Sequence, residues 1–128
     1  MSLRSPLGRI VGLGSARAGY GHWFSQRVTA VAVAILGVWL LVAFARFGSL
    51  DYGTVSSWLA HPANAVLCGL FVLATAQHTW LGLEVVIEDY VGNRLARLLL
   101  LVAAKFLFII AAAVGVLAIL RVATGAAG

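Results

Sequence analysis

Charged residues are scarce in this sequence. Asp, Glu, Lys and Arg make up 10% of its 128 residues, whereas soluble domains carry about 25%. Hydrophobic residues account for 62% of the chain. A water-soluble globular domain is therefore excluded, and we expect one membrane domain that comprises residues 1–128.

The cysteine content and the glycine-rich stretch near the N-terminus predict no functional site. Cys68 is the only cysteine and lies in an apolar run, so we interpret it as a small buried hydrophobic residue. The apolar runs begin only near Val28, too late for a cleavable signal peptide. The earlier GLGSAR lacks the third glycine and the preceding strand of a dinucleotide-binding fingerprint. We interpret residues 6–21 as an irregular surface segment available to a partner protein.

Acidic residues are rarer than basic ones. Four Asp and Glu stand against nine Lys and Arg, an excess that would suggest nucleic acid in a soluble protein. Here the basic residues flank apolar runs, so no nucleic-acid partner is expected, and the charges set orientation instead. Arg4, Arg9, Arg17, Arg27, Arg94 and Arg97 fall on one predicted side, and Arg46 and Arg121 on the other. This asymmetry predicts a cytoplasmic N-terminus and a C-terminus across the membrane.

Three long apolar runs occupy residues 28–45, 63–83 and 98–120, and only Lys105 interrupts them. A helix needs roughly 20 residues to cross the hydrocarbon core. None of the runs alternates at period two, as a membrane strand would. The sequence therefore predicts an all-α integral membrane protein with a cytoplasmic segment at 1–26. Its transmembrane helices are expected at about 27–46, 62–88 and 97–121.

An imidazole, His78, lies inside the second apolar run. On a helix, Gly82 and Asp89 share its face, and Asp89 is about 16 Å further along the axis. His78 is thus expected near the midplane of a core about 30 Å thick. An ionisable group at that depth is a functional hypothesis by default. The alternative is a neutral His78 that is hydrogen-bonded across helices to a serine or a carbonyl group.

Haem is the cofactor that this arrangement favours. Gly82, one turn from His78, leaves room for a flat macrocycle, and haem iron commonly takes a histidine axial ligand. His61 and His22 both lie too far along the chain to reach the midplane opposite His78. A second axial ligand would therefore come from another chain. We predict that the protein forms half of a two-subunit haem-binding helical bundle.

The pattern His78-x₃-Gly82-x₆-Asp89-Tyr90 resembles the second helix of the succinate dehydrogenase (respiratory complex II) hydrophobic membrane anchor, the small anchor of the proteobacterial and mitochondrial type. GLGSARAGYGHWFSQRVTAVAV, at residues 12–33, resembles the approach to the first helix of that family. The resemblance spans residues 5–120 and includes three helices in the same direction.

The resemblance implies an enzyme subunit without the succinate site. Succinate would be oxidised on a flavoprotein subunit, and electrons would pass through an iron–sulfur subunit to ubiquinone. A second, cytochrome b-type anchor would share one haem b with this chain. The expected location is the bacterial inner membrane, with a periplasmic C-terminus, or the mitochondrial inner membrane in a eukaryote. The enzyme would serve both the citric acid cycle and the electron transport chain.

The resemblance also assigns roles to residues. His78 would be the axial ligand of the haem iron, with Gly82 beside it. Tyr90 would donate a hydrogen bond to a quinone carbonyl, and Asp89 would be its acidic neighbour. Arg27 and His22 would lie near the haem propionates and the quinone. For Tyr90 the alternative is an interfacial anchor, and for Arg27 a topological charge.

Other interpretations remain open at this stage. An anchor of a related fumarate reductase is the nearest, followed by a small transporter subunit or a scaffold without haem. Two further charges remain: Glu84 directly follows the second apolar run, and Lys105 lies inside the third. Because the second and third helices are antiparallel, we predict an interhelical Glu84–Lys105 ion pair. The alternative for Lys105 is a haem propionate.

Overall fold

A computed structural model describes residues 15–126 of the chain. It contains α2 (Ser15–Ala45), α3 (Tyr52–Leu59), α4 (Pro62–Tyr90) and α5 (Arg94–Thr124). Within these residues there is no strand, and three of the helices are long and apolar enough to cross a membrane. The predicted all-α membrane fold is therefore confirmed.

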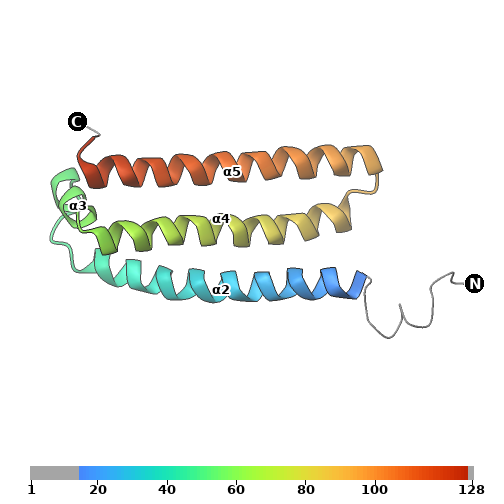
Figure 1. The fold of residues 1–128 in the computed structure, drawn as a ribbon, viewed down its shortest axis with the longest axis horizontal. Helices are drawn as coiled ribbons and strands as arrows, with labels where there is room; N and C mark the ends of the chain where they lie inside the picture. The colour runs from blue at the N-terminus through green and yellow to red at the C-terminus, as the bar shows by residue number, and fades with distance from the viewer. Residues whose placement is uncertain (1–14, 127–128) are drawn as a thin grey trace, which may run out of the picture.

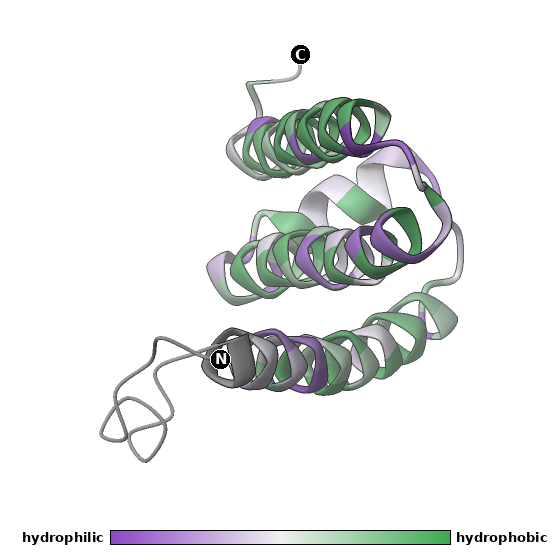
Figure 2. Cartoon of the chain, turned by 90° about the vertical axis from the view of Figure 1, so that its right-hand side faces the viewer, coloured by the Kyte–Doolittle hydropathy of each residue, from purple (hydrophilic) through white to green (hydrophobic). Residues whose placement is uncertain are grey.

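The three long helices lie side by side, with α4 between α2 and α5 (Figure 1). α4 packs against both neighbours, whereas α2 and α5 do not contact each other in the described part of the chain. Hydrophobic residues cover most of their length (Figure 2). Within the described residues few hydrophobic side chains are buried by the chain itself: Leu59, Cys68, Trp80, Leu81 and Ile87 form the small core. The row of helices thus offers broad apolar faces to lipid or to partner subunits.

Local signals set the ends of α4 and α5. Pro62 occupies the first turn of α4, where its missing N–H costs no hydrogen bond. The Asn93 side chain caps α5 by accepting a hydrogen bond from the Ala96 N–H at 3.0 Å. Arg97 Nε donates to the Val91 carbonyl oxygen at 3.0 Å, across the connecting turn. The turn between α4 and α5 is therefore short and internally bonded, which makes the two helices antiparallel neighbours.

The short helix α3 was not predicted. Asp51 caps it by accepting a hydrogen bond from the Thr54 N–H at 2.8 Å. Trp58 of this helix stacks on Trp39 of α2, with ring centroids 5.4 Å apart, and also packs against Phe44 and Phe47. This aromatic cluster holds α3 against the end of α2.

The first long helix begins earlier than predicted. α2 starts at Ser15, so the interpretation of residues 15–21 as irregular is wrong. The rest of that predicted segment, residues 6–14, lies outside the described residues, as do Arg4 and Arg9. The apolar run starts near Val28, and hydropathy alone did not reveal the more polar turns before it. Because these turns are helical, His22 and Arg27 lie on the same helix, α2.

One glycine lies at a tight contact between two long helices. A Cβ atom added to Gly115 of α5 would lie 3.0 Å from the Val72 Cγ1 atom of α4. Small residues let membrane helices approach closely, because association there depends on packing rather than on a hydrophobic drive. Gly115 therefore sets how closely α4 and α5 pack.

Candidate functional site

His78 is held by a cross-helix hydrogen bond. The structure places it half-buried on α4, with its Nδ1 atom 3.2 Å from the Thr29 hydroxyl oxygen of α2. The expected alternative of a cross-helix bond is thus correct for Nδ1, although the partner is a threonine rather than a serine or a carbonyl group. The described residues give Nε2 no hydrogen bond. One ring nitrogen is anchored and the other remains available.

The Thr29 hydroxyl is itself tied to its own helix. Its oxygen lies 2.8 Å from the Ser25 carbonyl oxygen and 3.1 Å from that of Gln26, and the hydroxyl donates there. Threonine in a helix commonly bonds back in this way to the preceding turn. Sequence reasoning missed Thr29, because helix periodicity gives the faces of one helix but not the rotation of its neighbour.

The surface one turn from His78 is open. A Cβ atom added to Gly82, one turn from His78, would meet nothing within 4 Å. His78 therefore combines a half-buried imidazole, whose Nε2 has no partner within the described residues, with an open surface one turn away. Within the described residues no three His, Cys, Asp or Glu side chains cluster to hold a metal ion. The predicted haem requires only one ligand from this chain, so such a cluster is not needed for it.

Asp89 and Tyr90 are the last two residues of α4. Both are exposed, and Tyr90 is 84% exposed. The described residues provide neither side chain with a hydrogen bond or an ion pair. Arg27 is also exposed, and its guanidinium carbon lies 5.7 Å from the centroid of the Trp23 ring. The structure therefore does not join Arg27 directly to Asp89 or Tyr90, and all three remain available to other molecules.

His22 meets an acidic residue. Its Nε2 atom lies 3.4 Å from a carboxylate oxygen of Glu84, and each side chain is 29% exposed. The separation satisfies an ion pair, but Nε2 lacks the geometry of a hydrogen bond. Coulomb attraction does not depend on bond angle. Protonation of His22 would thus make the contact an ion pair between α2 and α4.

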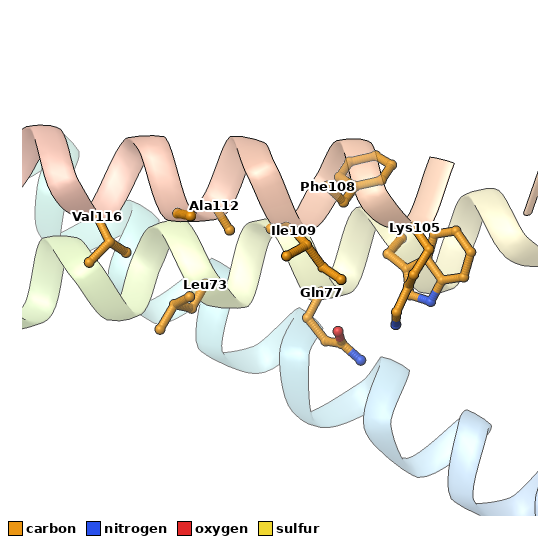
Figure 3. A pocket seen from close by; sticks show the side chains of 10 residues that line it. Leu73, Gln77, Lys105, Phe108, Ile109, Ala112 and Val116 are labelled. Atoms are coloured by element: carbon orange, nitrogen blue, oxygen red, sulfur yellow. The ribbon is translucent and has the colours of Figure 1, made fainter. Parts of the chain in front are cut away.

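Lys105 does not pair with Glu84, so that prediction is wrong. Its Nζ atom lies 4.7 Å from the centroid of the Trp80 ring on α4, a cation–π distance. Lys105 stands at one end of a groove of about 430 Å³ between α4 and α5, and Val116 stands at the other (Figure 3). His78 does not line this groove. Lys105 and His78 thus belong to different sites.

Comparison with known protein families settles the class of the chain. Residues 1–118 match the family described as succinate dehydrogenase/fumarate reductase transmembrane subunit. The chain belongs to that family. Its three apolar helices agree with the membrane location of the succinate dehydrogenase/fumarate reductase transmembrane subunits.

Individual relatives place the chain on the succinate dehydrogenase side of this family. It is 31% identical over 107 residues to the succinate dehydrogenase hydrophobic membrane anchor subunit of Rickettsia bellii. These residues make up 84% of this chain and 86% of the relative. The protein of the same name from Paracoccus denitrificans is 32% identical over 117 residues, 90% of this chain and 88% of its own. The Rickettsia conorii protein is 35% identical over 95 residues, 73% of this chain and 75% of its own. The predicted resemblance is thereby confirmed.

Proposed function

We propose that this chain is the small membrane anchor of a succinate:ubiquinone oxidoreductase that binds one haem b jointly with a second anchor subunit. Membership of the family and the names of the relatives support the anchor role. The observation that carries the haem assignment is His78, which lies in the middle of α4 with Nδ1 bonded to Thr29 and Nε2 unbonded. Haem b, when bound, accepts and returns one electron.

In this proposal His78 offers Nε2 to the haem iron, and Gly82 leaves the adjacent surface open. A histidine of the second anchor subunit would supply the other protein ligand of the haem. One broad face of the α2–α4–α5 row would then be covered by that subunit. The exposed apolar side chains of the row are compatible with such a partner.

The quinone part of the proposal concerns the Tyr90 end of α4. Tyr90 donates a hydrogen bond from its hydroxyl group to one carbonyl oxygen of ubiquinone, because a phenol O–H is a hydrogen-bond donor. Asp89, the preceding residue, relays protons or orients the phenol. Arg27 adds positive charge near the same side of the membrane, which we propose is cytoplasmic. The flavoprotein and iron–sulfur subunits would dock there, and the C-terminus would lie across the membrane.

A histidine substitution tests the haem assignment. His78→Ala in the complete complex should abolish or strongly weaken the low-spin haem b spectrum, because an axial ligand is lost. Succinate oxidation with an artificial acceptor should persist, since that reaction needs only the soluble subunits. His61→Ala is the matched control, because His61 is exposed and its side chain makes no capping bond. Full haem content with an unchanged spectrum in His78→Ala would refute the ligand role.

The direction of catalysis needs its own measurement, because the family description covers both succinate dehydrogenases and fumarate reductases. All the relatives quoted above carry the succinate dehydrogenase name. We therefore expect the purified complex to reduce ubiquinone with succinate faster than it reduces fumarate with quinol. The opposite ratio would assign the complex to fumarate reduction.

A further inference from the structure

The geometry around Thr29 defines the direction of its hydrogen bond to His78. Three distances converge on one oxygen atom, the Thr29 Oγ1: 2.8 Å to the Ser25 carbonyl oxygen, 3.1 Å to the Gln26 carbonyl oxygen and 3.2 Å to His78 Nδ1. Carbonyl oxygens only accept hydrogen bonds. The direction of the bond to His78 can therefore be deduced.

A hydroxyl group has one proton and two acceptor lone pairs. The shortest of the three distances leads to the Ser25 carbonyl oxygen, so the Thr29 proton is directed toward the backbone of α2. A lone pair then faces His78 Nδ1. Two atoms that both lack a proton would repel each other, so Nδ1 carries the imidazole proton and donates it to Thr29. In the neutral ring Nε2 consequently keeps its lone pair.

We propose that Thr29 is a positioning residue for His78, which fixes the ring and its tautomer so that Nε2 is the atom offered to the haem iron. This inference rests on the proposed function and adds a residue to it. Histidines that bind metals usually donate their other ring N–H to an oxygen, and this bond orients the ring and raises the basicity of the ligand. Here the oxygen belongs to a neighbouring helix, so the packing of α2 on α4 determines the orientation of the His78 ring.

The membrane makes this bond more important than it would be at a wet surface. Thr29 and His78 are both half-buried and lie within the apolar spans of α2 and α4. An unsatisfied N–H in hydrocarbon is costly, and little water is present to replace the partner. Without the hydroxyl, Nδ1–H must find another acceptor by rotation of the ring, or the proton must move to Nε2. Either change removes Nε2 from its ligating role.

Thr29→Val in the complete complex is the direct test, because valine keeps the branched shape and removes the hydroxyl. We expect haem affinity to fall by about 10- to 100-fold, the usual cost of losing an outer-shell partner. The haem that remains should have a more positive midpoint potential, since a less basic imidazole stabilises ferric iron less. Thr29→Ser restores the hydroxyl and should restore both values.

The matched control is Thr124→Val. Thr124 makes the same kind of bond to its own helix, 2.7 Å from its hydroxyl oxygen to the Leu120 carbonyl oxygen, but has no imidazole partner. It should change neither haem affinity nor potential. Where Thr29→Val does not assemble, Thr29→Cys takes its place, because a thiol is a weak acceptor of similar size. The cysteine variant should shift the potential in the same direction by a smaller amount.

His78→Ala, measured alongside, separates the two claims. Loss of haem in His78→Ala together with unchanged affinity and potential in Thr29→Val, or in Thr29→Cys where valine does not assemble, would overturn the positioning role alone. Retention of haem in His78→Ala would overturn the ligand assignment itself. A Thr29→Ser variant that behaves like Thr29→Val would also overturn the proposal, because the hydroxyl would then not be the group responsible.

Discussion

Tyr90→Phe removes one hydroxyl group from the end of α4. In the chain that hydroxyl contributes nothing to folding, because Tyr90 is 84% exposed and makes no hydrogen bond within the described residues. Assembly and haem content should therefore be unchanged. If the hydroxyl donates to a quinone carbonyl, its loss costs about 0.5–1.5 kcal/mol of net hydrogen-bond energy. At about 1.4 kcal/mol per tenfold change, this is roughly a 2- to 12-fold loss of quinone affinity.

The assay is succinate-driven reduction of ubiquinone by the purified complex over a range of quinone concentrations. The KM for ubiquinone should rise within that range, and turnover at saturation falls further only if the phenol also delivers protons. Tyr52→Phe is the control, because Tyr52 is 62% exposed on α3, at the opposite end of the row (Figure 1). Wild-type kinetics at all quinone concentrations, with normal assembly, would place Tyr90 outside the quinone site and leave it as an interfacial anchor.

Three further outcomes are expected. Gly115→Leu should destabilise the α4–α5 contact by about 1–3 kcal/mol, because a side chain at this position meets Val72. The loss is measured as dissociation of the assembled complex on heating in detergent. Gly69→Leu is the control, because a Cβ atom added to Gly69 would meet nothing within 4 Å. In double-mutant cycles of the same assay, Lys105→Met and Trp80→Leu should couple by about 0.5–2 kcal/mol, as a cation–π pair does. Lys105→Met and Glu84→Gln should couple less, because Glu84 lines the same hollow as Lys105 but forms its charged contact with His22; stronger coupling of the second pair than of the first would contradict the observed contacts. The pKa of Asp51 is lowered by hydrogen bonds from the Thr54 side chain and backbone, so its cap on α3 is fully present above its ordinary value of 3.8 and is lost as the pH falls below it. The amide-exchange protection of α3, which is the ratio of the intrinsic to the observed exchange rate, should therefore fall in that acid window, and protection that does not change with pH would refute the cap.

The transmembrane helices were predictable because lipid imposes a strong and local constraint. Each apolar run is long enough to span the core, and Pro62 and Asn93 mark where α4 and α5 begin. The start of α2 was harder to predict, because the residues after Ser15 are too polar to register as a span. α3 escaped prediction for a related reason: its eight residues are too few for periodicity, and only its Asp51 cap signals a helix.

The candidate site was predicted in part. The composition and spacing of α4 brought out His78, Gly82 and Asp89, because these three residues share one face of a helix, whereas Tyr90 was predicted from the family resemblance. The contacts between helices were not available from that reasoning. Thr29 could not be identified without the rotation of α2, and the Glu84–Lys105 pair assumed that similar depth implies contact. In the structure Glu84 lies near His22 of α2 instead, and Lys105 forms a cation–π contact with the Trp80 ring.

The order of the row also bears on how the protein enters the membrane. α4, the central helix, has the lowest mean hydropathy of the three spans and is the one that touches both neighbours. It emerges from the ribosome after α2 and before α5. A span with a glutamine, a histidine and a glutamate partitions into lipid less readily than its flanking spans do. The nascent chain is thus expected to keep α4 beside the insertion machinery, resting on α2, until synthesis of α5 supplies its second neighbour.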